Sequence, residues 1–266
     1  MNNACPMATL TLAAALSVTP VHAGLPSTIA QVKPAIAIVG TYKATNSPRF
    51  TLRGTGFVVA KDQEDKGNFV VTNAHVLPPS ETADTNADLV VQLRAGSLGL
   101  QMRTVKVLEV DALHDLALLR FEGPPVASFK VRDSGNVQEG QSMAFMGFPI
   151  GGALGFSPVT HRATVSSITT AALPTPTAKQ LNAKAIRSLR GEGTFNIFQL
   201  DGTAYPGNSG GPLFDPDNGD VLGVVNMVLL KGSHESALTQ PSGISYAIPS
   251  RFVLDLLNRH QGLAQP

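Results

Sequence analysis

The sequence has almost no cysteine and no tryptophan. Cys5 is the only thiol among 266 residues, so no intrachain disulfide can form. The zinc–thiolate and iron–sulfur sites that need several cysteines are excluded as well. We therefore expect a domain that is held by packing alone and that carries neither a metal nor a cofactor.

Net charge is also lacking. Twenty basic residues face 19 acidic ones, which gives a formal charge of +1, and Lys and Arg form no clusters. A phosphate-binding surface needs a clear local excess of basic residues, so we expect no nucleic-acid partner. With 43% hydrophobic and 15% charged residues, the composition is that of a compact folded protein.

Charged residues are absent from the N-terminus. Residues 7–21 (MATLTLAAALSVTPV) are apolar, yet shorter than the ~20 residues that span a bilayer. Small residues at Val21 and Ala23 match a signal-peptidase site. We predict that residues 1–23 are a signal peptide and that the protein is exported, to a periplasm or out of the cell, with no stable membrane insertion of the mature chain. Because Lys and Arg are missing before the apolar run, a buried N-terminal helix is the alternative.

Short β-prone runs, separated by turn residues, dominate the rest of the chain. They fall into two groups of six: 35–42, 52–60, 68–76, 88–94, 104–111 and 115–122, then 142–149, 161–169, 195–202, 210–215, 220–230 and 244–249. This pattern predicts an all-β protein of two six-stranded antiparallel β-barrels.

The polar segment 131–141 (VRDSGNVQEGQ) predicts the link between the two barrels, which places the first at 24–130 and the second at 142–266. Helical patterns cover 177–189, inside a long insertion at 170–194, and 250–260 at the C-terminus. In the C-terminal helix we expect Ser250 as N-cap and Phe252, Val253, Leu256 and Leu257 on the buried face.

One serine lies among glycines and prolines, in YPGNSGGPLFD (205–215). A serine hydroxyl attacks a carbonyl only when a base takes its proton and donors stabilise the oxyanion. Gly207 tolerates the backbone conformations that would point its amide and that of Ser209 at one spot. We interpret Ser209 as a nucleophile with Gly207 and Ser209 as oxyanion hole; an ordinary glycine-rich turn is the alternative.

A base and an acid must then come from elsewhere in the chain. Of six histidines, His75 ends an apolar run, where a barrel strand emerges at a cleft. Asp115 opens the apolar run DLALLRF and is favoured as the carboxylate over Asp111, which we expect in a loop. His114 precedes Asp115 on what we expect to be a strand, so the two side chains would point to opposite faces.

The motifs TNAHV, HDLALLR and YPGNSGGPL, in this order, resemble the chymotrypsin-fold serine proteases. GTGFVV, QLDG and GISYAIPSRFV make the resemblance greatest to the protease domain of the HtrA/Deg group. It implies that His75 is the general base and then acid, Asp115 its orienting group and Ser209 the nucleophile. Asn208 stands where digestive relatives carry an aspartate, so no activation by a new N-terminus is expected. We expect no PDZ domain, because the chain ends at Pro266.

The resemblance also implies a specificity pocket with Thr203 at its base and mainly apolar walls. The residues assigned to the pocket are Thr203, Val225, Asn226, Met227, Ile244 and Tyr246. Without a carboxylate at Thr203, we expect cleavage after small or medium aliphatic residues, although Asp201 lies close in sequence.

The sequence thus predicts a serine endopeptidase that acts on proteins or peptides, including unfolded chains, and leaves homo-oligomers open. A binder of unfolded polypeptides on the same fold is the alternative from another functional class. An esterase fits less well, since its GxSxG serine would need alternating βα units and a histidine late in the chain.

Overall fold

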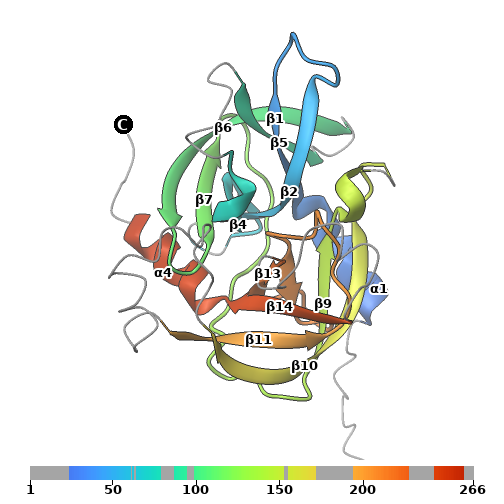
Figure 1. Ribbon diagram of the computed structural model, residues 1–266, viewed down its shortest axis with the longest axis vertical. Helices are drawn as coiled ribbons and strands as arrows, with labels where there is room; N and C mark the ends of the chain where they lie inside the picture. The colour runs from blue at the N-terminus through green and yellow to red at the C-terminus, as the bar shows by residue number, and fades with distance from the viewer. Residues whose placement is uncertain are drawn as a thin grey trace, which may run out of the picture.

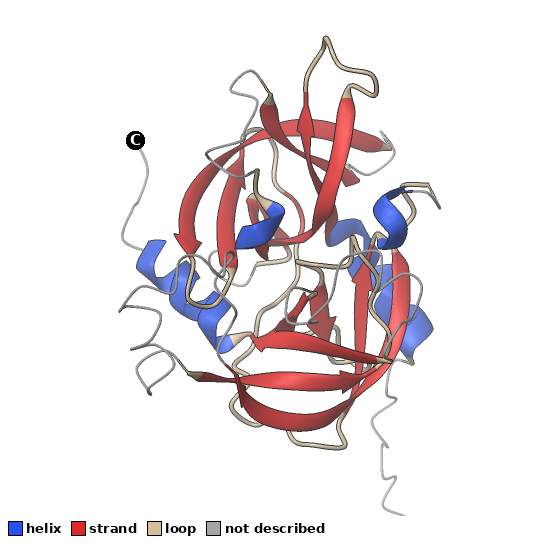
Figure 2. Ribbon diagram, viewed as in Figure 1, coloured by secondary structure: helices blue, strands red, loops and turns tan. Residues whose placement is uncertain are grey.

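The computed structural model describes residues 24–60, 62, 64–78, 87–94, 99–152, 155–171, 194–227 and 243–260. The predicted signal peptide, the predicted helix at 177–189 and nearly all of the insertion around it lie outside these residues. Two β-barrels stacked one above the other make up the body of the molecule (Figures 1 and 2).

The first barrel closes in the strand order β1-β2-β4-β7-β6-β5. Its strands are β1 (Ile36–Tyr42), β2 (Phe50–Val59), β4 (Phe69–Asn73), β5 (Asp88–Arg94), β6 (Leu100–Asp111) and β7 (Leu116–Phe121). Neighbouring strands are antiparallel, and β1 pairs with β5 to close the barrel. All six strands were predicted from the sequence, because β-branched and aromatic residues concentrate in them.

The second barrel closes in the order β10-β11-β14-β13-β12-β9. Its strands are β9 (Ser142–Gly147), β10 (Val159–Ala171), β11 (Phe195–Asp201), β12 (Pro212–Phe214), β13 (Val221–Asn226) and β14 (Ile244–Pro249). The prediction of two six-stranded antiparallel barrels is therefore confirmed. A short extra sheet pairs β3 (Lys66–Gly67) with β8 (Val126–Ala127), which are too short to show a pattern in the sequence.

One hydrophobic core runs from the first barrel into the second. Phe57, Phe129 and Phe214 are almost fully buried, and their rings contact one another in series across the junction. A second cluster around Phe145, Val165 and Leu213 fills the interior of the second barrel. Because apolar burial is continuous across the junction, packing holds the two barrels together without disulfides.

Of the two α-helices in the described residues, the sequence predicted only one. Helix α1 (Leu25–Val32) was not predicted, and the 3₁₀ turn η1 (Lys33–Ala35) leads from it into β1. Although α1 precedes the first barrel, Thr28 Oγ1 donates to the carbonyl of Asp217, next to β12 of the second barrel. Helix α1 therefore packs on the second barrel.

The C-terminal helix α4 (Arg251–His260) matches the prediction and buries Val253, Leu256 and Leu257. Ser250 stands at the predicted N-cap position, where its carbonyl accepts from the amides of Val253 and Leu254, but its Oγ donates to the carbonyl of Arg132 and does not cap the helix. Ser134 Oγ instead accepts from the Arg251 amide at 3.3 Å. The helix start is thus tied to the segment that joins the barrels.

Protonation of His161, on β10, should destabilise the fold. Its ring stacks on Phe145 with centroids 4.7 Å apart, and its buried Nε2 has no hydrogen-bond partner among the described residues. Burial lowers the pKa of His161, so around and below the usual value of about 6.5 the unfolded chain binds the proton more readily. The free energy of unfolding should therefore rise with pH through this window.

Urea unfolding between pH 5 and pH 8 measures this dependence. His161→Phe keeps a ring against Phe145 and should flatten part of the rise; an unchanged pH dependence in the variant would contradict the assignment.

Candidate active site

His75 lies at the junction of the barrels, where β4 ends in the 3₁₀ turn η2 (Ala74–Val76). β4 there lies beside β13 of the second barrel (Figure 1). The backbone amide of His75 donates to Asp115 Oδ1 at 2.9 Å, and its ring Nδ1 lies 2.5 Å from Asp115 Oδ2. The Nδ1 contact orients the ring, and an Nδ1–H that points at a carboxylate leaves Nε2 as the acceptor.

Asp115 is held in a strained turn. It has φ 51, in the left-handed region, just before β7 begins. Its carbonyl accepts from the Ala74 amide at 3.1 Å and from Asn73 Nδ2 at 3.0 Å. Such a φ costs energy for a residue other than glycine and persists only where neighbours hold it. Asp115 therefore lies in a turn and not on the expected strand, and that turn aims its carboxylate at His75.

Asn226, at the end of β13, completes the environment of this carboxylate. Its Nδ2 donates to Asp115 Oδ2 at 2.7 Å. Oδ2 thus contacts both His75 and Asn226, while Oδ1 accepts from the His75 amide. The carboxylate can neither rotate nor shift without breaking charge-assisted hydrogen bonds.

The rival carboxylate, Asp111, binds another histidine. It ends β6, and not in a loop as expected, and its Oδ2 lies 2.8 Å from His114 Nδ1. Burial alone would raise the pKa of Asp111, but the hydrogen bonds from His114 and the charges of His114 and Arg259 lower it overall. The His114 ring stacks on Phe252 of α4 with centroids 3.7 Å apart. This pair belongs to the contact between the first barrel and α4.

Ser209 follows a tight turn in the second barrel. The Asn208 amide donates to the Tyr205 carbonyl at 2.9 Å, and Gly207 has φ 100. Proline followed by a residue of positive φ is typical of a type II turn. After the serine, Gly210 has φ 84, and a Cβ there would lie 2.1 Å from the Thr55 carbonyl oxygen. Only a glycine at position 210 allows the backbone after Ser209 to pass this close to β2.

Ser209 is buried, with 5% of the residue exposed. Its Oγ accepts from the Met227 amide at 3.3 Å, and the described contacts include no hydrogen bond between Ser209 and His75. Met227 follows Asn226, which binds Asp115. The end of β13 thus contacts both Ser209 and Asp115, and Asp115 in turn contacts His75.

The turn also orients the amides predicted as oxyanion hole. The Pro206 carbonyl accepts from the Ile150 amide in η4 (Pro149–Gly152) at 2.7 Å. The Asn208 carbonyl, which shares a peptide plane with the Ser209 amide, accepts from the Gly211 amide at 2.9 Å. Both carbonyls are therefore engaged, and the amides of Gly207 and Ser209 have no hydrogen-bond partner in the part of the chain described.

The residues predicted for the specificity pocket differ in their surroundings. Val225 and Met227 are buried, Thr203 and Tyr246 half-buried, and Ile244 is 38% exposed. Tyr246 pairs with Asn226 across β14 and β13. The Asn226 side chain turns to Asp115, whereas the sequence assigned it to the pocket wall. Asp201 is exposed and pairs with Ile244.

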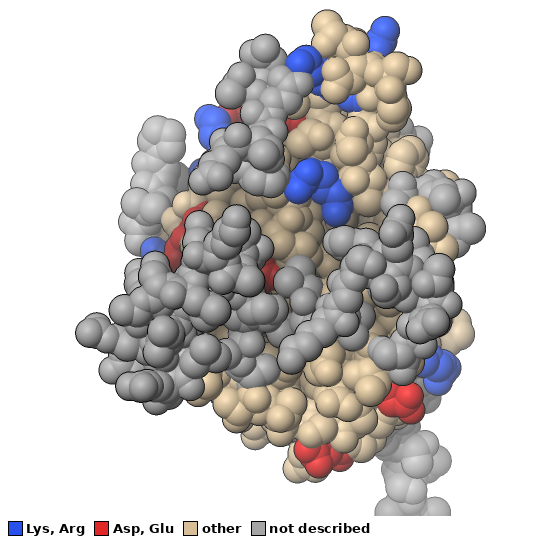
Figure 3. Space-filling view, viewed as in Figure 1, with Lys and Arg blue, Asp and Glu red and all other residues tan. Residues whose placement is uncertain are grey.

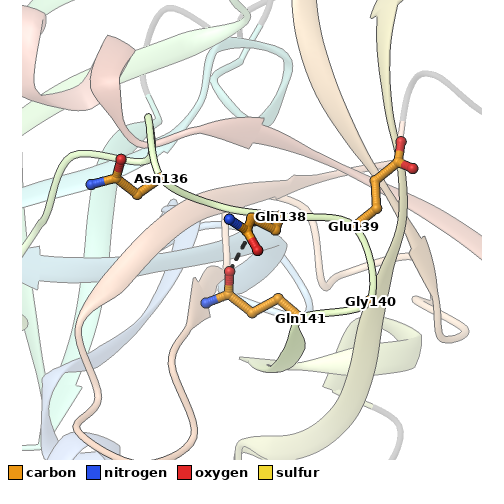
Figure 4. A pocket seen from close by; sticks show the side chains of 5 residues that line it. All are labelled: Asn136, Gln138, Glu139, Gly140 and Gln141. Carbon is orange, nitrogen blue, oxygen red and sulfur yellow. Dashed lines mark hydrogen bonds between the residues drawn. The ribbon is translucent and has the colours of Figure 1, made fainter.

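A hollow of about 620 Å³ lies at the segment that joins the barrels (Figure 4). It is lined by Asn136, Gln138, Glu139, Gly140 and Gln141. Some of its polar groups bond within the protein: the backbone amide of Gln138 donates to Gln141 Oε1, and Glu139 Oε1 accepts from the Ile168 backbone amide. The hollow holds no nucleophile with a base, so it is not a second catalytic candidate.

The surface and the remaining side chains add little further chemistry. Basic and acidic groups appear as separate spots on the face in Figure 3. Within the described ranges, no group of His, Cys, Asp and Glu could hold a metal ion. Neither of the two α-helices described there is long and apolar enough to cross a bilayer.

Two contacts at the candidate site, made by Thr55 and Asn226, were not predicted from the sequence. Thr55 binds the serine loop through Oγ1 and through its amide, which donates to the Ser209 carbonyl at 2.9 Å. The GTGFVV motif, which contains Thr55, is the sequence feature that could have indicated this contact. The role of Asn226 had no local signal, because it depends on the end of β13 meeting the turn that carries Asp115.

Comparison with known proteins adds the family. Residues 54–224, more than half of the chain, match the model of the "Trypsin-like peptidase domain" family. A "Probable periplasmic serine endoprotease DegP-like" of Pseudomonas fulva is 27% identical over 77% of the chain and 34% of its own length. The "Serine protease Do-like HtrA" of Bacillus subtilis is 28% identical over 79% of the chain and 40% of its own length. The chain therefore spans well under half the length of these curated relatives.

A solved structure, "HtrA-type protease AlgW with tripeptide", superposes with a TM-score of 0.59 at 21% identity and covers 91% of the chain and 64% of its own. At this identity the similarity supports the two-barrel fold. From the family match, the chain belongs to the trypsin-like peptidase family, with HtrA-type serine proteases among its relatives.

Proposed function

We propose that this protein is an exported serine endopeptidase with His75, Asp115 and Ser209 as its catalytic triad. The observation that carries the proposal is the contact of His75 with Asp115 at 2.5 Å. The Ser209 turn meets the same strand end that binds Asp115.

In the first half of the reaction, His75 Nε2 takes the proton of the Ser209 hydroxyl while Oγ attacks the peptide carbonyl carbon. The carbonyl oxygen becomes an oxyanion, and the Gly207 and Ser209 amides donate to it. Asp115 stabilises the imidazolium and keeps its Nδ1–H in place. His75 then gives its proton to the leaving amine, the C–N bond breaks, and an acyl ester remains on Ser209.

In the second half, a water molecule loses a proton to His75 and attacks the ester carbonyl. The same two amides stabilise the second oxyanion. The C–O bond to Ser209 breaks, the hydroxyl regains its proton from His75, and the acid product leaves.

The substrate is a protein or peptide, and unfolded chains are included. The buried Val225 and Met227 at the end of β13 support an apolar pocket with Thr203 at its base. Cleavage then follows small or medium aliphatic residues. Cleavage confined to Lys or Arg in a peptide panel would contradict this part of the proposal.

Export rests on the apolar segment before Gly24 and on relatives such as the one from Pseudomonas fulva, which is named as a periplasmic endoprotease. Intact mass of the protein recovered from the periplasm or the medium tests it. A mass that corresponds to a start at Gly24 supports cleavage after Ala23, and a full-length mass contradicts it.

Incubation of denatured casein with the purified protein tests the activity. Mass spectrometry of the products identifies the cleaved bonds. Binding of casein without any cleavage would favour the alternative, a non-catalytic binder of unfolded polypeptides.

A further inference from the structure

Arg53, on β2, carries a positive charge that no acidic side chain in the described part of the chain neutralises. Its Nε donates to the Val76 carbonyl at 2.6 Å, and its Nη2 to the Leu77 carbonyl at 3.0 Å. Both acceptors follow His75 directly. Burial lowers the pKa of Arg53, but a guanidinium remains charged at neutral pH.

Arg53 lies next to the strand segment that contacts the Ser209 loop. A Cβ at Gly54, the next residue, would lie 2.7 Å from Val76 Cγ2 and 3.0 Å from the Ser209 carbonyl oxygen. Thr55, one residue further, binds the carbonyls of Ser209 and Gly207. The backbone around Arg53 thus bridges the segment of His75 and the loop of Ser209.

The position of Arg53 indicates which part of a substrate it meets. The predicted acyl-side pocket uses β13, whose end contacts Ser209 and Asp115. Arg53 extends from β2, on the first-barrel side of the serine loop, and is tied to the residues just after His75. His75 protonates the departing amine, so this amine must lie next to His75. The substrate residues that follow the scissile bond therefore lie against the first barrel.

We propose that Arg53 binds a carboxylate of the substrate within the first three residues after the scissile bond. This inference rests on the proposed endopeptidase function and adds a specificity to it. It makes an acidic group on the leaving-group side a determinant of cleavage.

The chemistry favours a carboxylate over other acceptors. A guanidinium has five N–H donors in a planar fork, and the two carbonyls occupy only some of them. The side chain is already fixed by these two hydrogen bonds, so a carboxylate costs little additional ordering. An Asp or Glu side chain and the terminal carboxylate of a short substrate offer the same group.

A purely structural role is the competing explanation, because Arg53 also satisfies the last carbonyls of η2. Loss of that role would slow cleavage of every substrate alike. A binding role changes the ratio between an acidic substrate and its neutral isostere.

The test starts from one peptide sequence that the protein cleaves in denatured casein. Peptides are made with Asp or Asn at each of the first three positions after the cleaved bond. A further pair ends two residues after the bond, with a free carboxylate or an amide. For the wild type we expect kcat/KM about tenfold higher for the acidic member at one position or in the terminal pair; which pair responds identifies the source of the carboxylate.

Arg53→Met keeps the apolar stem and should bring that ratio close to one, whereas Arg53→Lys should keep part of it. In the wild type, 0.5 M salt should reduce the ratio as well, which gives a measurement that needs no variant. Equal kcat/KM within every pair for the wild type, or an unchanged ratio in Arg53→Met, would overturn the inference while leaving the peptidase function intact. If the wild type cleaves neither casein nor any peptide, the proposed function fails and this inference fails with it.

Discussion

Ser209→Ala should reduce kcat for peptide hydrolysis by about 10⁵–10⁶-fold. The variant keeps the turn and its amides but has no oxygen to form the acyl ester. His75→Ala should cause a loss of similar size, because the hydroxyl then has no base. The double variant should be no slower than either single one, since residues that act as a unit lose their effect together.

The Ser209 side chain has a hydrogen bond only from the Met227 amide among the described contacts, so we expect little change in thermal stability for Ser209→Ala. Circular dichroism and thermal melting provide that control. Retention of more than a hundredth of the wild-type kcat in the folded variant would rule out Ser209 as the nucleophile.

Asp115→Asn should reduce kcat by about 10⁴-fold near neutral pH. The amide that replaces the carboxylate cannot stabilise an imidazolium, and it can hold His75 in the wrong tautomer. The structure makes this loss large, because both oxygens of Asp115 are used by His75 and one also by Asn226. Steady-state kinetics on a peptide substrate measure it.

Asp111→Asn is the matched control. It removes a carboxylate four residues away that binds His114 and lies 3.7 Å from Arg259, and it should leave kcat within about fivefold of the wild type. It should instead lower the free energy of unfolding by about 1–3 kcal/mol. Because the pKa of Asp111 is lowered in the folded protein, its carboxylate stabilises the fold above the usual Asp pKa of about 3.9. At pH 7 this contribution to the free energy of unfolding is fully present. A larger loss of kcat from Asp111→Asn than from Asp115→Asn would reverse the assignment.

The strands could be predicted because each is a local pattern. The run NFVVTNAHV, for example, contains β4 and the turn that carries His75. Helix α1 could not be predicted, because its eight residues directly follow the apolar N-terminal segment and it is stabilised by contact with the second barrel. The two-residue strands β3 and β8 exist only through pairing with each other.

In the candidate site as well, features within a local motif could be predicted, whereas contacts between distant segments could not. Ser209 and its glycines form a local motif, and the positive φ of Gly207 and Gly210 is what such a motif predicts. The positive φ of Asp115 was not foreseen, because HDLALL gives no sign that the turn extends to the aspartate. The link between Asn226 and Asp115 joins residues far apart in sequence, so it becomes visible only when the two barrels are assembled. The roles of the pocket residues and the barrel boundaries stay predictions.

The most direct test of the account is covalent labelling by a fluorophosphonate, followed by mass spectrometry of the digested protein. The account predicts one phosphonyl adduct, on the peptide that contains Ser209, and its disappearance in both Ser209→Ala and His75→Ala. An adduct on another residue, or unchanged labelling of Ser209 in folded His75→Ala, would contradict it.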